Sequence, residues 1–173
     1  MNSVDHPEAA APAIVQRGLY ADELEVGARY AHRPGRTVSE SDNILFSSLT
    51  MNTQALHLDA AFAETQPFGQ RLMNSMWTLS TLVGASVTQI TQGTLVAQLG
   101  LTDVAFSAPV FHGDTLYCET EIVQKRASGS RPGQAVVTMR HTGRNQRGEV
   151  VATATRTALM WLDADAATQG ESR

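Results

Sequence analysis

His57 is the residue whose type and surroundings best suit acid–base chemistry in this chain of 173 residues. It lies in an irregular stretch, 50–58, between two segments with helical spacing, and Asn52 precedes it by five residues. Because an imidazole titrates near neutral pH, a histidine in such a stretch can act as a general base. The alternative is a histidine that only satisfies loop carbonyl groups, and the spacing alone favours that alternative.

A second place for chemistry is the start of a long helix, which the spacing predicts over 74–90. The first backbone N–H groups of a helix have no partner inside it, so those near Ser75 could stabilise negative charge on an oxygen. Every buried helix has such a start. A plain helix cap made by Asn74 or Ser75 is therefore the commoner interpretation.

The sequence gives little support for a metal site, a nucleotide-binding site or a catalytic nucleophile. The histidines include no pair four residues apart, and Cys118 is the only cysteine. Cys118 stands in an alternating strand pattern, which is typical of a buried apolar side chain rather than a reactive thiol. The glycine motifs of dinucleotide and phosphate sites are missing, and so is the G-x-S-x-G elbow of serine hydrolases.

The composition is that of one ordinary domain, with 42% hydrophobic residues, 17% charged residues and a net charge of -4. A weakly acidic chain has no general attraction to nucleic acid or to anionic membranes. Neither a basic segment followed by an apolar run nor a membrane-spanning apolar stretch is found, so we expect a cytoplasmic location. We expect mobile tails at 1–15 and 163–173, around one domain at 16–162.

The long helix is expected to be the centre of the fold. Apolar or small side chains cover most of its faces, which is typical of a buried helix. After Gly93 the hydrophobic period changes to two, and short turns separate the alternating segments. The sequence therefore predicts an α+β domain with a long antiparallel sheet wrapped around the helix. The expected strands are 28–38, 95–106, 115–125, 134–142 and 149–162.

Two shorter helices are expected before the long one. Ser39 or Ser41 can cap the first, because serine accepts a hydrogen bond from the backbone two or three residues later. Asp59 can cap the second in the same way, and that helix is expected over 59–65. One face of the first helix is apolar and includes Ile44, Leu45 and Leu49.

Two segments resemble motifs of the MaoC-like dehydratases and (R)-specific enoyl-CoA hydratases. TMNTQALHLDAAFAETQPFGQRLMNSMWTLSTLVG, at 50–84, is similar to the hydratase-2 motif S/T-G-D-x-N-P-L-H-x-D and the helix start H-G-M that follows it. SAPVFHGDTLYCETEIV, at 107–123, looks like the P-V-x-x-G-D strand pair of that family. The resemblance covers about 35–162 and implies a hot-dog fold, dimerisation and a coenzyme A thioester whose acyl chain enters a tunnel near the helix start.

The same resemblance implies roles for individual residues. His57 matches the catalytic histidine, and Ser75 matches the glycine whose backbone N–H binds the thioester oxygen. Asp59 matches the second, structural aspartate of the motif. Asn52, however, occupies the position of the catalytic aspartate, and an amide can orient water but cannot take its proton at neutral pH. Either His57 acts alone as the base, or the substrate assists, or the chain has lost activity.

The sequence T-M-N-T-x-x-L-H, together with F-H-G-D and S-R-P, resembles motifs of a subgroup of this family. That subgroup acts on branched dicarboxylic acyl-CoA esters such as mesaconyl-CoA and itaconyl-CoA. Arginine is the residue best shaped to hold a carboxylate, through two parallel hydrogen bonds. The candidates for substrate binding are Arg36, Arg71, Arg131 and Arg144.

Three functions remain open at this point. An acyl-CoA hydratase or dehydratase is preferred, with no cofactor beyond the coenzyme A of its substrate. A hot-dog thioesterase would need a carboxylate beside the helix start, and no Asp or Glu occurs between Gln66 and Gln98. Asn52 also allows an acyl-CoA-binding protein without activity. A homodimer or larger homo-oligomer is expected, because the apolar strand 149–162 could be an uncovered sheet edge.

Overall fold

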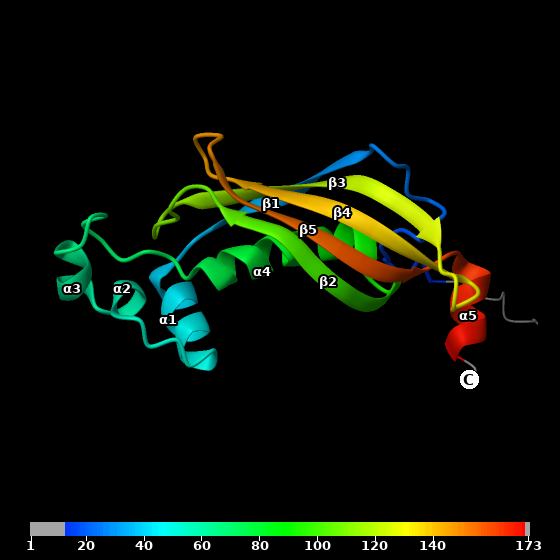
Figure 1. The fold of residues 1–173 in the computed structure, drawn as a ribbon, viewed down its shortest axis with the longest axis horizontal. Coiled ribbons are helices and arrows are strands. Elements are labelled where there is room, and N and C mark those ends of the chain that lie inside the picture. Colours follow the sequence, from blue (N-terminus) through cyan, green and yellow to red (C-terminus); the bar gives the residue numbers. More distant parts are fainter. Residues whose placement is uncertain (1–12, 172–173) are drawn as a thin grey trace, which may run out of the picture.

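The computed structural model describes residues 13–171 as a five-stranded sheet that curves over one helix (Figure 1). The strands are β1 (Arg29–Thr37), β2 (Leu95–Phe106), β3 (Thr115–Ala127), β4 (Gln134–Arg144) and β5 (Val150–Trp161). Their order is β1-β3-β4-β5-β2, and each neighbouring pair runs antiparallel. The helix is α4 (Ser75–Ser86). The predicted α+β architecture is confirmed.

The prediction that 149–162 forms a sheet edge is wrong. β5 lies inside the sheet, where it pairs with β4 on one side and with β2 on the other. Its buried residues therefore lie on the inner face of a central strand, and they are not an edge that awaits a partner. The edges of the sheet are β1 and β2.

Three helices lie beyond one end of the sheet, next to the start of α4 (Figure 1). They are α1 (Glu40–Leu49), α2 (Ala55–Leu58) and α3 (Ala60–Glu64). Ser39 caps α1 and forms a capping box with Asp42, and Asp59 caps α3, as predicted. Helix α2 is a single turn in the stretch that we expected to be irregular, and it carries His57.

Helix α4 extends further than its regular part. It continues through a π-helical turn, η1 (Val87–Thr91), and the chain then turns at Gly93, whose φ is +72°. Together α4 and η1 span almost the whole helix predicted at 74–90. The helix lies close to the sheet at Gly143, where a Cβ atom would come within 2.7 Å of Leu82.

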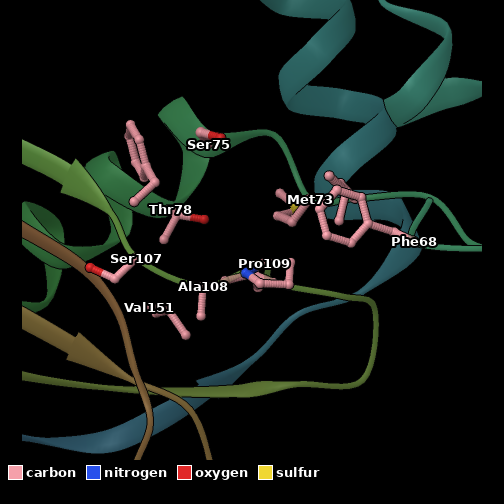
Figure 2. A pocket seen from close by; sticks show the side chains of 11 residues that line it. Phe68, Met73, Ser75, Thr78, Ser107, Ala108, Pro109 and Val151 are labelled. Carbon is pink, nitrogen blue, oxygen red and sulfur yellow. The ribbon is translucent and has the colours of Figure 1, made fainter. Parts of the chain in front are cut away.

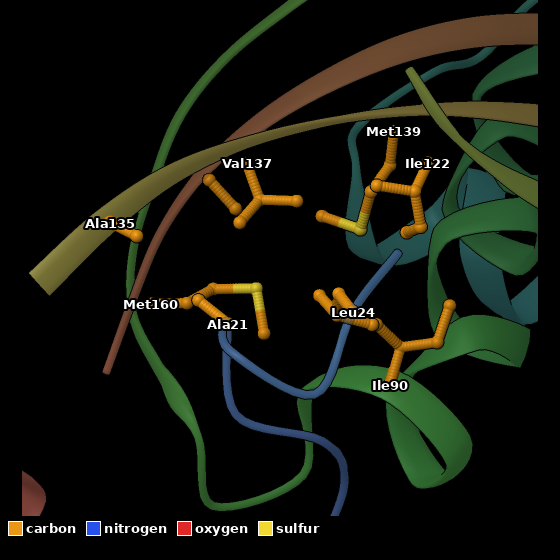
Figure 3. Close-up of a cluster of buried hydrophobic side chains, with 9 residues drawn as sticks. Ala21, Leu24, Ile90, Ile122, Ala135, Val137, Met139 and Met160 are labelled. Atoms are coloured by element: carbon orange, nitrogen blue, oxygen red, sulfur yellow. The ribbon is translucent and has the colours of Figure 1, made fainter. Parts of the chain in front are cut away.

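The π-helical turn η1, which follows α4, packs on an apolar cluster that we call the distal core (Figure 3). Alternate residues of β4 and β5 point into it, as a strand period of two requires. It consists of Ala21, Leu24, Ile90, Ile122, Ala135, Val137, Met139, Ala158 and Met160. A second apolar cluster, with Trp77, Leu82 and Val151, lies nearer the start of α4.

The C-terminal segment differs from the expected tail. Residues Ala164–Glu171 form helix α5, which begins after Asp163, whose Oδ1 accepts a hydrogen bond from Ala166 N at 2.8 Å. The N-terminal tail predicted at 1–15 lies mostly outside the described residues. Among the described helices, none is both long enough and apolar enough to cross a membrane.

Candidate active site

A pocket of about 310 Å³ opens where the start of α4 meets the end of β2 (Figure 2). Its wall is mostly apolar and includes Ser75 and Thr78 from α4 and Val151 from β5. The segment that follows β2 provides Ser107, Ala108, Pro109 and Val110, and the remaining lining residues are Phe68, Leu72, Met73 and Phe106. A mostly apolar pocket with a few polar groups is typical of a small-molecule site.

Ser75 brings a free backbone donor to this pocket. Asn74 precedes it as the helix cap, and the Oδ1 of Asn74 accepts a hydrogen bond from Met76 N at 3.0 Å. The N–H groups of Trp77 and Thr78 reach the carbonyl oxygen of Asn74. The Ser75 N–H has no hydrogen-bond partner among the described residues, so it can serve as an oxyanion donor at the positive end of the helix dipole.

His57 lies next to the pocket and is held in one orientation. Its Nδ1 is 2.9 Å from the carbonyl oxygen of Leu72, a residue that lines the pocket. A carbonyl oxygen can only accept, so Nδ1 carries the hydrogen, and in the neutral imidazole Nε2 keeps its lone pair. The half-buried imidazole therefore presents the nitrogen that a general base needs, although within one chain His57 itself is not part of the pocket wall.

Asn43 of α1 forms hydrogen bonds both with the turn that carries His57 and with the start of α4. The sequence did not single out this residue. Its side chain is fully buried, and its Oδ1 accepts a hydrogen bond from Asn74 N at 3.0 Å. Its Nδ2 donates to the carbonyl oxygens of His57 at 3.0 Å and Leu72 at 2.9 Å, and approaches Nε2 of His112 at 3.2 Å. One amide thus fixes both the turn that carries His57 and the start of α4.

Ser47 adds a further hydrogen bond to this arrangement, because its Oγ accepts from Nδ2 of Asn74 at 3.2 Å. We call the buried polar group of Asn43, Ser47 and Asn74 the polar junction. The buried face of α1 is therefore polar. The apolar face of that helix points outward, with Ile44 45%, Leu45 62% and Leu49 74% exposed.

Asn52 lies in the turn between α1 and α2, half-buried. Its backbone N–H donates to Ser47 O at 2.9 Å, and its Oδ1 accepts from Gln54 N at 3.1 Å, which closes a local side-chain turn. The turn places Asn52 on the same segment as His57, but not in the wall of the pocket. Asp59 caps α3 and takes no part in the site, in line with the structural role expected for it.

The four candidate arginines are not part of the pocket wall. Arg36 pairs with Asp42 at 2.5 Å, and Arg71 pairs with Glu40. Arg144 is exposed and donates to the carbonyl oxygen of Gly148 at 3.1 Å. Arg131 is exposed on the turn between β3 and β4, which lies beside α5 at the other end of the sheet from α1 (Figure 1). None of these four lines the described pocket.

Cys118 and His112 are two further residues with side chains that could react, and the fold encloses each of them at least in part. Burial raises the pKa of the Cys118 thiol to about 11, so it stays protonated, which agrees with the expected buried side chain. The pKa of His112 is lowered, mainly by burial and then by the charge of Arg71. Within residues 13–171, no three side chains of His, Cys, Asp or Glu gather as metal ligands would.

Comparison with protein families gives a match to the model of the MaoC like domain over residues 22–155. Two enzymes are similar in sequence. Mesaconyl-CoA hydratase of Cereibacter sphaeroides is 29% identical over 134 residues, which cover 78% of this chain and 38% of that protein. The (R)-specific enoyl-CoA hydratase of Aeromonas caviae is 31% identical over 108 residues, which cover 62% of this chain and 78% of that protein.

A solved structure agrees with the fold. A Mycobacterium tuberculosis protein, described as having a double hotdog fold, superimposes with a TM-score of 0.76 at 27% identity. The match covers 86% of this chain and 46% of that one. The hot-dog fold expected from the sequence is therefore confirmed. The chain spans 38% of the length of the Cereibacter relative and about half of the double hotdog protein.

Proposed function

This chain belongs to the MaoC-like domain family, and on that basis we propose that it catalyses the reversible hydration of an enoyl-CoA thioester. The observation that carries the proposal is the joint placement of His57 and the free Ser75 N–H. Both are anchored through Asn43, and both adjoin a mostly apolar pocket. Hydration needs one group to remove a proton from water and another to stabilise an enolate oxygen, and these two residues can provide those groups.

The proposed steps use these two groups. The thioester carbonyl oxygen accepts a hydrogen bond from Ser75 N–H, which favours the enolate that forms during the reaction. Nε2 of His57 takes a proton from water as the oxygen of that water bonds to Cβ of the substrate. The same imidazole can then return the proton to Cα, so the sum is addition of water across the double bond. In the reverse direction a 3-hydroxyacyl thioester loses water.

The proposed substrate is a branched dicarboxylic acyl-CoA, of the mesaconyl or itaconyl kind. The similarity to the mesaconyl-CoA hydratase of Cereibacter sphaeroides supports this class, and the similarity to the (R)-specific enoyl-CoA hydratase of Aeromonas caviae supports hydration of enoyl-CoA in general. Asn52 also fits the class, because a neutral amide avoids placing a second negative charge near the carboxylate of the substrate. Asn52 would orient the water, and His57 would take its proton.

A homodimer is part of the proposal, and the exposed edge β2 is its proposed interface. Large apolar side chains are exposed along β2, including Leu99 at 54% and Val104 at 39%. Phe68 and Phe106 line the pocket and are also exposed, at 48% and 44%. A second copy seated on this edge would cover apolar surface, pair the free strand and close the open side of the pocket.

The assembly can be tested by measuring the mass in solution at micromolar concentration. We expect at least twice the mass of one chain. Val104→Glu should shift the protein toward monomer, because it places a charge in the middle of the proposed interface, whereas Thr88→Glu, on the exposed part of η1, should not. A strictly monomeric wild-type protein contradicts the dimer.

The activity can be tested with crotonyl-CoA, mesaconyl-CoA and itaconyl-CoA, by following enoyl-thioester absorbance and free thiol together. Loss of absorbance without thiol release is the expected result. Thiol release would instead indicate a thioesterase. Binding of all three esters without either change would indicate an acyl-CoA-binding protein without activity, the alternative that Asn52 suggests.

A further inference from the structure

Thr78 on α4 carries a buried hydroxyl group that the protein itself leaves unused. The residue has only 2% of its surface exposed, and it belongs to the wall of the pocket. Its Oγ1 forms no hydrogen bond with a described residue, yet it is not among the enclosed side-chain atoms that lack a partner. The small surface that Thr78 keeps therefore includes its hydroxyl. In Figure 2 this hydroxyl points into the space between α4 and Pro109.

Other hydroxyl groups on the helices of this protein bond to their own backbone. Thr50, at the end of α1, donates from Oγ1 to Phe46 O at 2.8 Å. Ser86, at the other end of α4, donates from Oγ to Val83 O at 2.7 Å. Such bonds are common, because a carbonyl oxygen three or four residues earlier lies within reach of the hydroxyl. Among the described residues Thr78 forms no bond of this kind, so its donor is free for a ligand.

Thr78 stands one turn after Ser75, on the same face of α4. Residues three apart on a helix are neighbours, with Cβ atoms about 5–6 Å apart, and helix side chains lean toward the start of their helix. The free hydroxyl and the free Ser75 N–H therefore face the same pocket. Three carbon–carbon bonds of about 1.5 Å carry the fourth carbon of an acyl chain roughly 4 Å from the thioester carbon. An acyl group held at the Ser75 N–H thus brings its fourth carbon near Thr78.

The pocket ends just beyond Thr78. Leu82, the next residue on that face of the helix, is fully buried and packs against the sheet at Gly143. It belongs to the same apolar cluster as Val151, which lines the pocket. A longer acyl chain would have to displace Leu82, so the site suits a short acyl group whose end lies at Thr78.

The surroundings of Thr78 indicate which chemical group it can recognise. None of the residues that line the pocket is charged, and Ala108 and Val151 beside Thr78 are apolar. In Figure 2 the hydroxyl of Ser107 points away from Thr78. A threonine hydroxyl has one hydrogen to donate, so its best partner here is an acceptor oxygen. An apolar group would instead cover the hydroxyl and leave it without a partner, which is unfavourable.

We propose that Thr78 is a specificity-determining residue, whose hydroxyl donates a hydrogen bond to an oxygen on the fourth carbon of a short acyl group. The inference rests on the proposed acyl-CoA site. The carboxylate of a dicarboxylic acyl-CoA ester provides such an oxygen, and so does a ketone at the same carbon. The hydroxyl then discriminates between acyl groups of one shape, because only those with the oxygen satisfy it.

The test compares three CoA esters of nearly the same shape by calorimetry. The fourth carbon bears two oxygens in succinyl-CoA, one oxygen and one methyl group in 4-oxopentanoyl-CoA, and two methyl groups in 4-methylpentanoyl-CoA. We expect the wild-type protein to bind both oxygen-bearing esters roughly threefold to tenfold more tightly than the third. Thr78→Val, which replaces the hydroxyl by a methyl group, should lose that preference. Thr78→Ser should keep it.

The matched control is Thr81→Val, the same change one turn further along α4. Thr81 is half-buried and is not part of the pocket wall, so this variant should keep the wild-type preference. The melting temperature is a second readout. Because the Thr78 hydroxyl has no partner among the described residues, Thr78→Val should unfold at the wild-type temperature or above it. If Thr78→Val does not fold, Thr78→Ala replaces it in the binding comparison.

Several results would overturn the inference. The first is binding of 4-methylpentanoyl-CoA by the wild-type protein as tightly as both oxygen-bearing esters. The others are an unchanged preference in Thr78→Val, and a loss of preference in Thr78→Ser or Thr81→Val as large as in Thr78→Val. A clearly lower melting temperature of Thr78→Val, with equal loss of affinity for all three esters, would assign the hydroxyl to the fold and also overturn it.

The inference and the proposed function can fail separately. If the wild-type protein hydrates no enoyl-CoA but shows the preference that depends on Thr78, the proposed activity is wrong and the role of Thr78 stands. If only 4-oxopentanoyl-CoA is preferred, that role stands and the dicarboxylic substrate class is wrong. If the protein hydrates mesaconyl-CoA and crotonyl-CoA, and Thr78→Val lowers both rates equally, hydration stands and the inference is wrong.

When both are right, the ratio of kcat/KM for mesaconyl-CoA over crotonyl-CoA reports the same hydrogen bond, because only mesaconyl-CoA has oxygens on its fourth carbon. That ratio should fall roughly threefold to tenfold in Thr78→Val and stay constant in Thr81→Val.

Discussion

The two ends of the long helix formed by α4 and η1 are held by different forces. Around Ile90 the distal core is entirely apolar, and its side chains are held by burial, which has no preferred direction. At Ser75 the polar junction fixes the helix start through hydrogen bonds of 2.9 to 3.2 Å, which depend on the position of each atom. We infer that the distal core supplies stability and that the polar junction supplies the geometry of the site. Changes at the two ends should therefore have separable effects.

The largest effect is expected from His57→Ala. Loss of the proposed base should lower turnover of crotonyl-CoA by roughly 10²–10⁴-fold, the usual contribution of acid–base catalysis. The half-buried imidazole contributes little to the core, so the melting temperature should change by only a few degrees. A folded variant with the wild-type rate would show that His57 is not the base.

Ile122→Ala tests the other end of the helix. The side chain is fully buried in the distal core, so its truncation should cost about 2–5 kcal/mol in the free energy of unfolding. Below the melting temperature, kcat per folded molecule should stay within twofold of the wild-type value. Urea unfolding and turnover at low temperature measure the two quantities. A large fall in kcat with little loss of stability would contradict the proposal that the distal core supplies stability and the polar junction supplies the geometry of the site.

Asn43→Leu should affect both properties, because Asn43 positions His57 and the start of α4 without touching the substrate. Three backbone groups lose a buried partner, and we expect a cost of about 1–3 kcal/mol in unfolding free energy. We also expect kcat to fall while KM changes little, because misplacement of the base affects the reaction more than binding. Asn43→Asp keeps the acceptor for Asn74 N but turns a carboxylate oxygen toward the two carbonyl oxygens, so it should not recover the stability. Equal changes in kcat and KM would point to a binding role instead.

Features that depend on neighbouring residues were predicted correctly from the sequence, whereas features that depend on contacts with distant residues were not. The caps at Ser39 and Asp59 were predictable, because each depends on atoms within three residues. The strands followed from a period of two, but the place of β5 inside the sheet depends on β2, more than forty residues earlier in the chain. The apolar residues of α1, such as Leu45, are exposed, because polar partners on other segments place Asn43 and Ser47 on its buried face. Arg156 on β5 is only 2% exposed, whereas an arginine in an alternating strand predicts an exposed side chain.

The buried His141 predicts how stability depends on pH. Its pKa is about 3 in the folded protein, against an ordinary value of 6.5. Between these values the unfolded chain binds a proton that the folded chain does not, so stability is lost as pH falls from about 6.5 toward 3. The slope from this one group is at most about 1.4 kcal/mol per pH unit. His141→Asn should give a shallower decline in urea unfolding between pH 7 and 4.5. An unchanged slope would mean that other groups control acid unfolding.

The smallest effect is expected from Asn52→Asp, and it bears on how the site was adapted. The substitution keeps the acceptor for Gln54 N, so the turn that carries Asn52 should be preserved. Only the charge changes. Near a substrate carboxylate, a second carboxylate costs energy by repulsion in a pocket with little water. With crotonyl-CoA the repulsion is missing, and the new carboxylate can help His57 to accept the proton.

We therefore expect Asn52→Asp to lower kcat/KM for mesaconyl-CoA several-fold and to leave or raise kcat/KM for crotonyl-CoA, both measured at pH 7.5. Asn52→Ala is the control, because it removes the amide without adding charge and should slow both substrates alike. An equal gain on both substrates would show that repulsion does not explain Asn52. A loss on both would mean that the amide donor itself is required, since the aspartate keeps the acceptor oxygen and lacks only the N–H group.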